Sequence, residues 1–121
     1  MRQVIFTDKA PAAIGPYSQA IKINGLVYTS GQVPVNPETK KIDSEDIEIQ
    51  AKQVMKNLDA VLKAANTDLS RVVKSTIFLK DLNDFAKVNE IYGSFFKSEP
   101  PARSCVQVAK LPLDCKIEIE V

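Results

Sequence analysis

Four side chains able to do chemistry lie near the end of the chain. Arg103 and Cys105 are two residues apart in one short stretch, and Glu118 and Glu120 are two residues apart in the next. A guanidinium binds carboxylates through charge-assisted, bidentate hydrogen bonds, and a carboxylate can act as a general base. These residue types indicate a site that holds a small acid and moves a proton.

Histidine is absent from the sequence, so the commonest metal ligand and the commonest general acid and base are both missing. Two cysteines cannot complete a four-ligand structural zinc site, and no Cys-x-x-Cys spacing occurs. We therefore expect no metal site, with any chemistry carried by carboxylates, Tyr, Lys, Ser or Cys.

The composition is that of a globular chain. With 121 residues, 45% of them hydrophobic and 26% charged, we expect a single domain over residues 1–121. The 16 basic and 15 acidic side chains are spread along the sequence, which argues against a nucleic-acid partner, because duplexes are met by a concentrated basic face. We find no apolar run long enough for a membrane span and no secretory signal.

Helical periodicity is strongest over residues 44–65, where Asp43 and Ser44 supply capping oxygens and Asn66 closes the helix. A second, shorter helix is predicted over residues 84–96. The stripe of the first helix consists of Ile47, Ala51, Val54, Leu58, Val61, Leu62 and Ala65, and that of the second of Phe85, Val88, Ile91, Tyr92 and Phe95.

Strand patterns occupy the remaining chain, at residues 2–6, 18–24, 26–32, 73–80, 102–109 and 115–121. The pair Asn24-Gly25 is a strong signal for a two-residue hairpin turn. The order β-β-β-α-β-α-β-β predicts an α+β fold in which two helices pack on one face of a mixed sheet. The other face must then be polar or covered by another chain.

The last two strands are expected to form a hairpin. Matching Val106 and Val108 to the apolar residues of the last strand, Ile117 and Ile119, fixes the register, because a one-residue slip would turn every side chain over. That register puts the guanidinium, the Cys105 thiol and both glutamates on one face. The alternation by itself, however, favours an ordinary solvated strand face for the two glutamates, because strands with polar outer faces are common.

The same hairpin places Cys105 and Cys115 too far apart for a disulfide, so we expect two free thiols and a reducing, cytoplasmic location. Three other features carry weaker signals: Tyr17 in a stiff Pro- and Gly-containing loop, Ser30-Gly31 at a strand end, and Asn89 beside the apolar stripe of the second helix. For each of these, taken alone, a purely structural role is a better explanation than a functional one.

Five segments together resemble one family, the RidA (YjgF-type) reactive-intermediate deaminases. They occur in the family's order over nearly the whole chain: AAIGPYSQ at 12–19, TSGQVP at 29–34, KDLNDF at 80–85, PARSCV at 101–106 and KIEIE at 116–120. The resemblance implies a chorismate-mutase-like fold and a homotrimer whose sheets face inward, with active sites at the subunit interfaces.

The activity implied by the resemblance is hydrolysis of 2-imino acids, and of their enamine tautomers, to 2-oxo acids and ammonia without a cofactor. By this resemblance Arg103 clamps the substrate carboxylate and Glu118 activates water, with Glu120 as a second candidate base. The family's pocket-lining positions correspond to Tyr17, Ser30, Gly31, Asn89 and Cys105.

Two other functions stay open. One is a trimer that binds small carboxylates without turnover, as a regulatory or chaperone-like protein. The other is an endoribonuclease, against which the missing histidine and the near-neutral net charge of +1 both argue.

Overall fold

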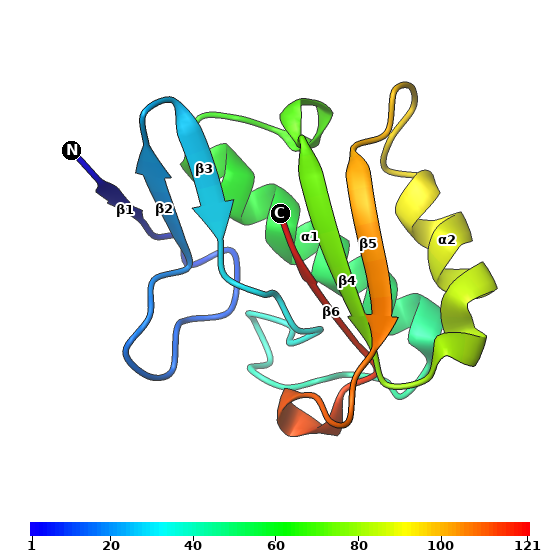
Figure 1. Cartoon of the computed structure of the whole chain (residues 1–121). Helices are drawn as coiled ribbons and strands as arrows, with labels where there is room; N and C mark the ends of the chain where they lie inside the picture. The colour runs from blue at the N-terminus through cyan, green and yellow to red at the C-terminus, as the bar shows by residue number, and fades with distance from the viewer.

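The computed structural model describes residues 1–121 and contains every helix and strand that the sequence pattern predicts, in the predicted order (Figure 1). The strands and the second helix are shorter than predicted. The elements are β1 Gln3–Ile5, β2 Ala20–Ile23, β3 Leu26–Thr29, α1 Ile47–Ala64, β4 Lys74–Leu79, α2 Phe85–Gly93, β5 Ala102–Gln107 and β6 Ile117–Glu120.

The strands form one mixed layer built from two three-stranded sheets. In the first sheet β1, β2 and β3 are antiparallel neighbours, and in the second β4 lies between β5, which is parallel to it, and β6, which is antiparallel. The two sheets meet where β3 approaches β6. There the Thr29 amide donates to the Val121 carbonyl at 3.0 Å and Gln32 bridges Ile119.

The predicted hairpin between the last two strands is wrong. β5 and β6 are both neighbours of β4 and never pair with each other. The outward-facing Val106 is 44% exposed, so this strand does not turn its valines toward the core as the register argument assumed. Alternation along a strand shows that it has two different faces but does not show which strand lies beside it.

The β2–β3 turn confirms the predicted hairpin. Asn24 and Gly25 have φ values of 51° and 77°, the left-handed pair that a two-residue turn of this twist requires. The turn gives a fixed register in which Ile21 lies opposite Tyr28.

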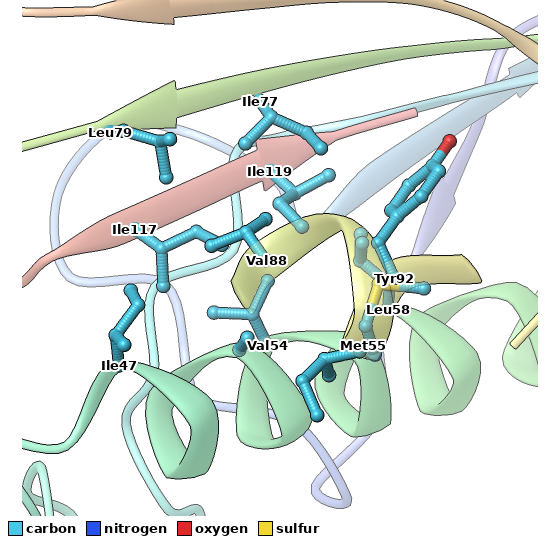
Figure 2. Packing of buried hydrophobic residues seen from close by; sticks show 12 residues of the cluster. Ile47, Val54, Met55, Leu58, Ile77, Leu79, Val88, Tyr92, Ile117 and Ile119 are labelled. Carbon is cyan, nitrogen blue, oxygen red and sulfur yellow. The ribbon is translucent and has the colours of Figure 1, made fainter. Parts of the chain in front are cut away.

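Both helices cover the same face of the sheet (Figure 1). In Figure 2, Ile77, Ile117 and Ile119 of the sheet point toward α1, and side chains of α2 fill the space between. The whole predicted stripe of α1 is buried; of the α2 stripe, Val88, Ile91 and Tyr92 are buried, whereas Phe85 and Phe95 are not.

The first turn of α1 differs from the prediction. Asp46, rather than Asp43 or Ser44, caps the helix by accepting a hydrogen bond from the Glu48 amide at 2.7 Å. Asp43 instead accepts hydrogen bonds from Asn36 and Thr39 in the preceding loop. The predicted end is confirmed, since Asn66 follows the C-cap with a left-handed φ of 61°.

The opposite face of the sheet carries apolar side chains that no element of the chain covers. Val4, Tyr28 and Val106 are 57%, 57% and 44% exposed on this open face. Cys105 of β5 and Cys115, which precedes β6, are both free thiols, in agreement with the prediction, although β4 separates β5 from β6. Neither helix has the length and apolarity that crossing a bilayer would demand.

Candidate active site

Arg103 lies on β5, on the sheet face that the helices cover, and its guanidinium reaches α2. One terminal nitrogen donates a hydrogen bond to Oδ1 of Asn89 at 2.7 Å. The central carbon of the guanidinium lies 5.4 Å from the ring centre of Phe85 and 5.3 Å from that of Tyr92, within cation–π range of both.

No carboxylate neutralises this guanidinium. The ion pairs of the structure join Lys63 to Asp59 and Lys80 to Asp114, and neither includes Arg103. One of its five N–H donors is taken by Asn89, so the rest can serve an incoming anion. Arg103 therefore has the charge and the donors to bind a carboxylate in a bidentate manner.

Cys105 lies two residues further along β5, on the same face as Arg103, and is half-buried. Burial raises the pKa of its thiol, and the nearby positive charge of Arg103 only partly opposes that shift. The thiol is therefore protonated at neutral pH, which argues against a nucleophilic role.

Glu118 lies on β6 with its carboxyl group against the main chain of Gly31. A Cβ atom built on Gly31 would overlap the carboxylate and would stand 2.8 Å from its carboxyl carbon. The φ angle of Gly31 is not in the left-handed region, so glycine is needed here for close approach rather than for backbone conformation.

Two effects raise the pKa of Glu118. The larger is desolvation, which disfavours the charged form, and the smaller is the negative charge of Glu120. A half-buried carboxyl group with a raised pKa suits proton transfer near neutral pH better than a free carboxylate.

Ser30, which directly precedes Gly31 in the chain, and Tyr17 line a hollow of about 580 Å³. The Ser30 hydroxyl donates to the Ser18 carbonyl at 2.6 Å, which ties the end of β3 to the loop that carries Tyr17. The ring of Tyr17 is 52% exposed. Ser30 thus connects two pairs of neighbours, since the next residue, Gly31, lies against Glu118, and Tyr17 lines the same hollow as Ser30.

Glu120 is exposed and lies opposite Thr76 of β4. It shares the open face of the sheet with Glu118, as the alternation predicts, and lines a separate hollow of about 300 Å³. No group of three or more potential ligands (His, Cys, Asp or Glu) lies together in a way that could hold a metal ion.

The two halves of the predicted site lie on opposite faces of the sheet. Arg103 is opposite Ser75 on β4 and Glu118 is opposite Phe78, so the two residues are two strands and three residues apart. At about 4.8 Å per strand and 3.3 Å per residue, each offset is roughly 10 Å. The prediction that the guanidinium, the thiol and both glutamates share one face is wrong.

Sequence reasoning also missed two residues, since Phe85 and Tyr92 were assigned to the core stripe of α2 without a role in the site. The spacing of these two residues from Asn89 could have identified them. Phe85, Asn89 and Tyr92 follow each other at four and three residues, which puts all three on one helix face.

Comparison with known proteins finds relatives that match almost the whole chain. The family model described as Endoribonuclease L-PSP matches residues 7–121. The chain is 57% identical over 119 residues to Reactive Intermediate Deaminase A, chloroplastic, of Arabidopsis thaliana, covering 98% of this chain and 64% of that protein. It is also 51% identical over 119 residues to the RutC family protein PYRAB12510 of Pyrococcus abyssi, covering 98% and 94%.

Solved structures match just as closely. RidA from the Antarctic bacterium Psychrobacter sp. is 47% identical with a TM-score of 0.94, covering 98% of this chain and 95% of that one. E. coli TdcF, solved with bound serine, is 45% identical with a TM-score of 0.93, covering 98% and 94%. The fold is the α+β, chorismate-mutase-like fold of these proteins, and the chain belongs to the RidA (YjgF/RutC) family.

Proposed function

We propose that this protein hydrolyses short 2-imino acids, and the enamines that precede them, to 2-oxo acids and ammonia. The substrates we propose are 2-iminobutanoate and 2-iminopropanoate. The observation that carries the proposal is the Arg103 guanidinium, which has no carboxylate partner and most of its donors free. The Arabidopsis relative named for deamination of reactive intermediates and the serine bound to TdcF both support a small substrate with a carboxylate.

The active site, in this proposal, is completed by two copies of the chain within a homotrimer. Arg103 and Glu118 face opposite sides of one sheet, so a single chain does not bring them into contact with one small molecule. The exposed apolar side chains of the open face support its burial against another copy. One chain would supply Arg103 and Asn89, and its neighbour would supply Tyr17, Ser30, Gly31 and Glu118.

The reaction needs few groups, because a protonated imine carbon is already electrophilic. With the substrate carboxylate on Arg103, the Glu118 carboxylate takes a proton from water as the oxygen bonds to the imine carbon. The product of this step is a tetrahedral carbinolamine. Glu118 then donates this proton to the amino nitrogen. The C–N bond breaks as the hydroxyl oxygen forms the carbonyl, ammonia leaves, and the hydroxyl proton passes to solvent water, so that Glu118 is again a carboxylate.

Positioning and proton transfer supply the rate enhancement. Each tenfold acceleration requires about 1.4 kcal/mol off the barrier, and holding water, base and substrate in line is an adequate source. The raised pKa of Glu118 lets the same group accept the proton and give it back. Cys105 is assigned to substrate binding through its main chain, and Glu120 is retained as a second candidate base.

The test couples the protein to a pyridoxal-phosphate dehydratase and follows release of the 2-oxo acid. We expect Arg103→Ala to lower the enzyme-dependent rate by at least about 100-fold, since a charge-assisted bidentate pair is lost. Arg71→Ala is the matched control, because Arg71 is exposed and makes no contact with the proposed site. Equal rates in wild type and Arg103→Ala, after correction for spontaneous hydrolysis, would reject the proposal.

A second candidate function is carboxylate binding without turnover, and Glu118→Gln separates the two. Loss of deamination with unchanged binding of 2-oxobutanoate supports catalysis. A third candidate, cleavage of RNA, is suggested by the description of the family model. RNA cleavage that persists in both Arg103→Ala and Glu118→Gln would place that activity outside the site described here.

A further inference from the structure

Arg103 is held against one face of α2 by three residues. Phe85 and Tyr92 contact the guanidinium through their rings, and Asn89, which lies between them on the helix, accepts a hydrogen bond at 2.7 Å. The rings limit the positions of the guanidinium group and the hydrogen bond fixes its rotation. The donors that remain are thereby directed away from α2.

The ring of Tyr92 is itself held in place by a hydrogen bond. The Tyr92 hydroxyl donates to Oγ of Ser75 at 2.8 Å, and Ser75 is fully buried at 0% exposure. Ser75 lies opposite Arg103 in the β4–β5 register. The ring that supports the guanidinium is therefore anchored to the strand next to Arg103, so β4, β5 and α2 together set one orientation.

The group that accepts the hydrogen bond from Arg103 is a neutral amide and not a carboxylate. A buried arginine is commonly paired with a carboxylate, which would cancel its charge and compete with an anionic ligand. The amide oxygen of Asn89 accepts the same hydrogen bond while carrying no net charge. The guanidinium is oriented and still carries its full positive charge.

We propose that Asn89 is a positioning residue that acts on the substrate through Arg103, and that its neutrality is required for binding the carboxylate. This assignment rests on the proposed function and changes the role given to Asn89 by the family resemblance, which placed it among the residues that line the pocket. The Oδ1 atom of Asn89 is occupied by Arg103 rather than turned to a ligand.

The decisive variant is Asn89→Asp, which has nearly the same shape and keeps an oxygen acceptor but adds a negative charge. We expect its dissociation constant for 2-oxobutanoate, measured by titration calorimetry, to rise at least tenfold, and KM to rise more than kcat falls. Asn83→Asp adds the same charge on an exposed residue of the loop before α2 and serves as the matched control. A purely structural hydrogen bond predicts that Asn89→Asp binds like wild type, and that result would overturn the proposal.

A second measurement needs no ligand. In wild type, the Arg103 side-chain Nε–H should give a restricted signal in nitrogen-15 NMR, and Asn89→Ala should make that group mobile without lowering the unfolding midpoint by more than a few degrees. An equally rigid guanidinium in Asn89→Ala would refute the positioning role. If Arg103→Ala binds 2-oxobutanoate as wild type does, the proposed function fails. If Arg103→Ala loses binding of 2-oxobutanoate but the Asn89 variants bind it as wild type does, the proposed function stands and this inference fails.

Discussion

At the residue scale, the main chain of Gly31 lies against the carboxyl group of Glu118. A methyl group on residue 31 would collide with that carboxyl group, which must then move. We expect Gly31→Ala to lower deamination by at least about tenfold, because a displacement of the base by an ångström is enough to misalign water and substrate. The coupled dehydratase assay measures the loss.

Gly93→Ala is the matched control for this prediction. Gly93 ends α2, and a Cβ built there meets no atom within 4 Å. Alanine at a helical position should raise stability by roughly 0.5–1 kcal/mol with activity unchanged. Full activity in Gly31→Ala would mean that Glu118 does not need its observed position.

Glu118 and Glu120 differ in a way that pH can separate. In the proposed mechanism Glu118 acts as a base in its ionised form, so activity should rise as pH rises through its pKa. The charge of Glu120 contributes to the raised pKa of Glu118. We expect Glu120→Gln to keep most of kcat and to shift the acid limb of the pH–rate profile to lower pH. An unshifted limb would show that the charge of Glu120 does not influence the catalytic base, and a lost kcat would favour Glu120 itself as the base.

The same raised pKa has a consequence for stability. The folded state holds the Glu118 proton more tightly than the unfolded chain does, where the pKa is near its ordinary value of 4.5. The resulting contribution is fully present below pH 4.5 and is lost as pH rises through the folded-state pKa. Glu118→Gln should therefore gain stability relative to wild type as pH rises from 4 to 7, measured by urea unfolding. A constant difference between the two proteins across that range would contradict the shift.

At the element scale, the start of α1 depends on one side chain. Asp46 caps the helix through the Glu48 amide, so Asp46→Ala should cost about 1 kcal/mol in the free energy of unfolding. Glu45→Ala is the control, since Glu45 precedes the cap and is exposed. A larger loss in Glu45→Ala than in Asp46→Ala would show that the cap lies elsewhere.

The elements that could be predicted from the sequence are those with local causes. The stripe of α1 recurs every three to four residues, and Asn24-Gly25 has the conformational freedom that its turn demands. The prediction placed the cap at Asp43 and Ser44 rather than at Asp46, because all three are residue types that favour the N-cap and they lie within four residues. In the structure Asp43 is bonded to Asn36 and Thr39, the Ser44 hydroxyl accepts from the Asp46 amide, and Asp46 accepts from the Glu48 amide.

The neighbour of each strand could not be predicted in the same way. β4 inserts between β5 and β6 although it precedes them both in the chain with α2 in between. Parallel pairing of β4 with β5 turns Arg103 to the helices, and antiparallel pairing with β6 turns Glu118 to the open face. The types of the site residues could therefore be read from the sequence, whereas their division between two faces could not.

At the scale of the whole molecule, the placement of Arg103 and Glu118 on opposite faces would give the proposed homotrimer a chemical role. Each residue would then form half of a site that a second copy of the chain completes. The apolar side chains of the open face would supply the contact area between copies. The need to bring Arg103 of one copy near Glu118 of another would require a defined arrangement of the chains. Under this arrangement, a variant that stays folded as a monomer should be inactive.

Mixed oligomers test this division directly. Arg103→Ala and Glu118→Gln chains are each expected to be inactive, but a site between two different chains can combine the intact Arg103 of one with the intact Glu118 of the other. Unfolding and refolding an equal mixture should restore about one quarter of the wild-type activity, the fraction of two-chain sites in which both residues are native. Mixing Arg103→Ala with a chain that carries both substitutions is the control, because no such site can form. If the equal mixture also stayed inactive while size-exclusion chromatography with light scattering showed that the chains had assembled together, both residues of each site would have to come from the same chain.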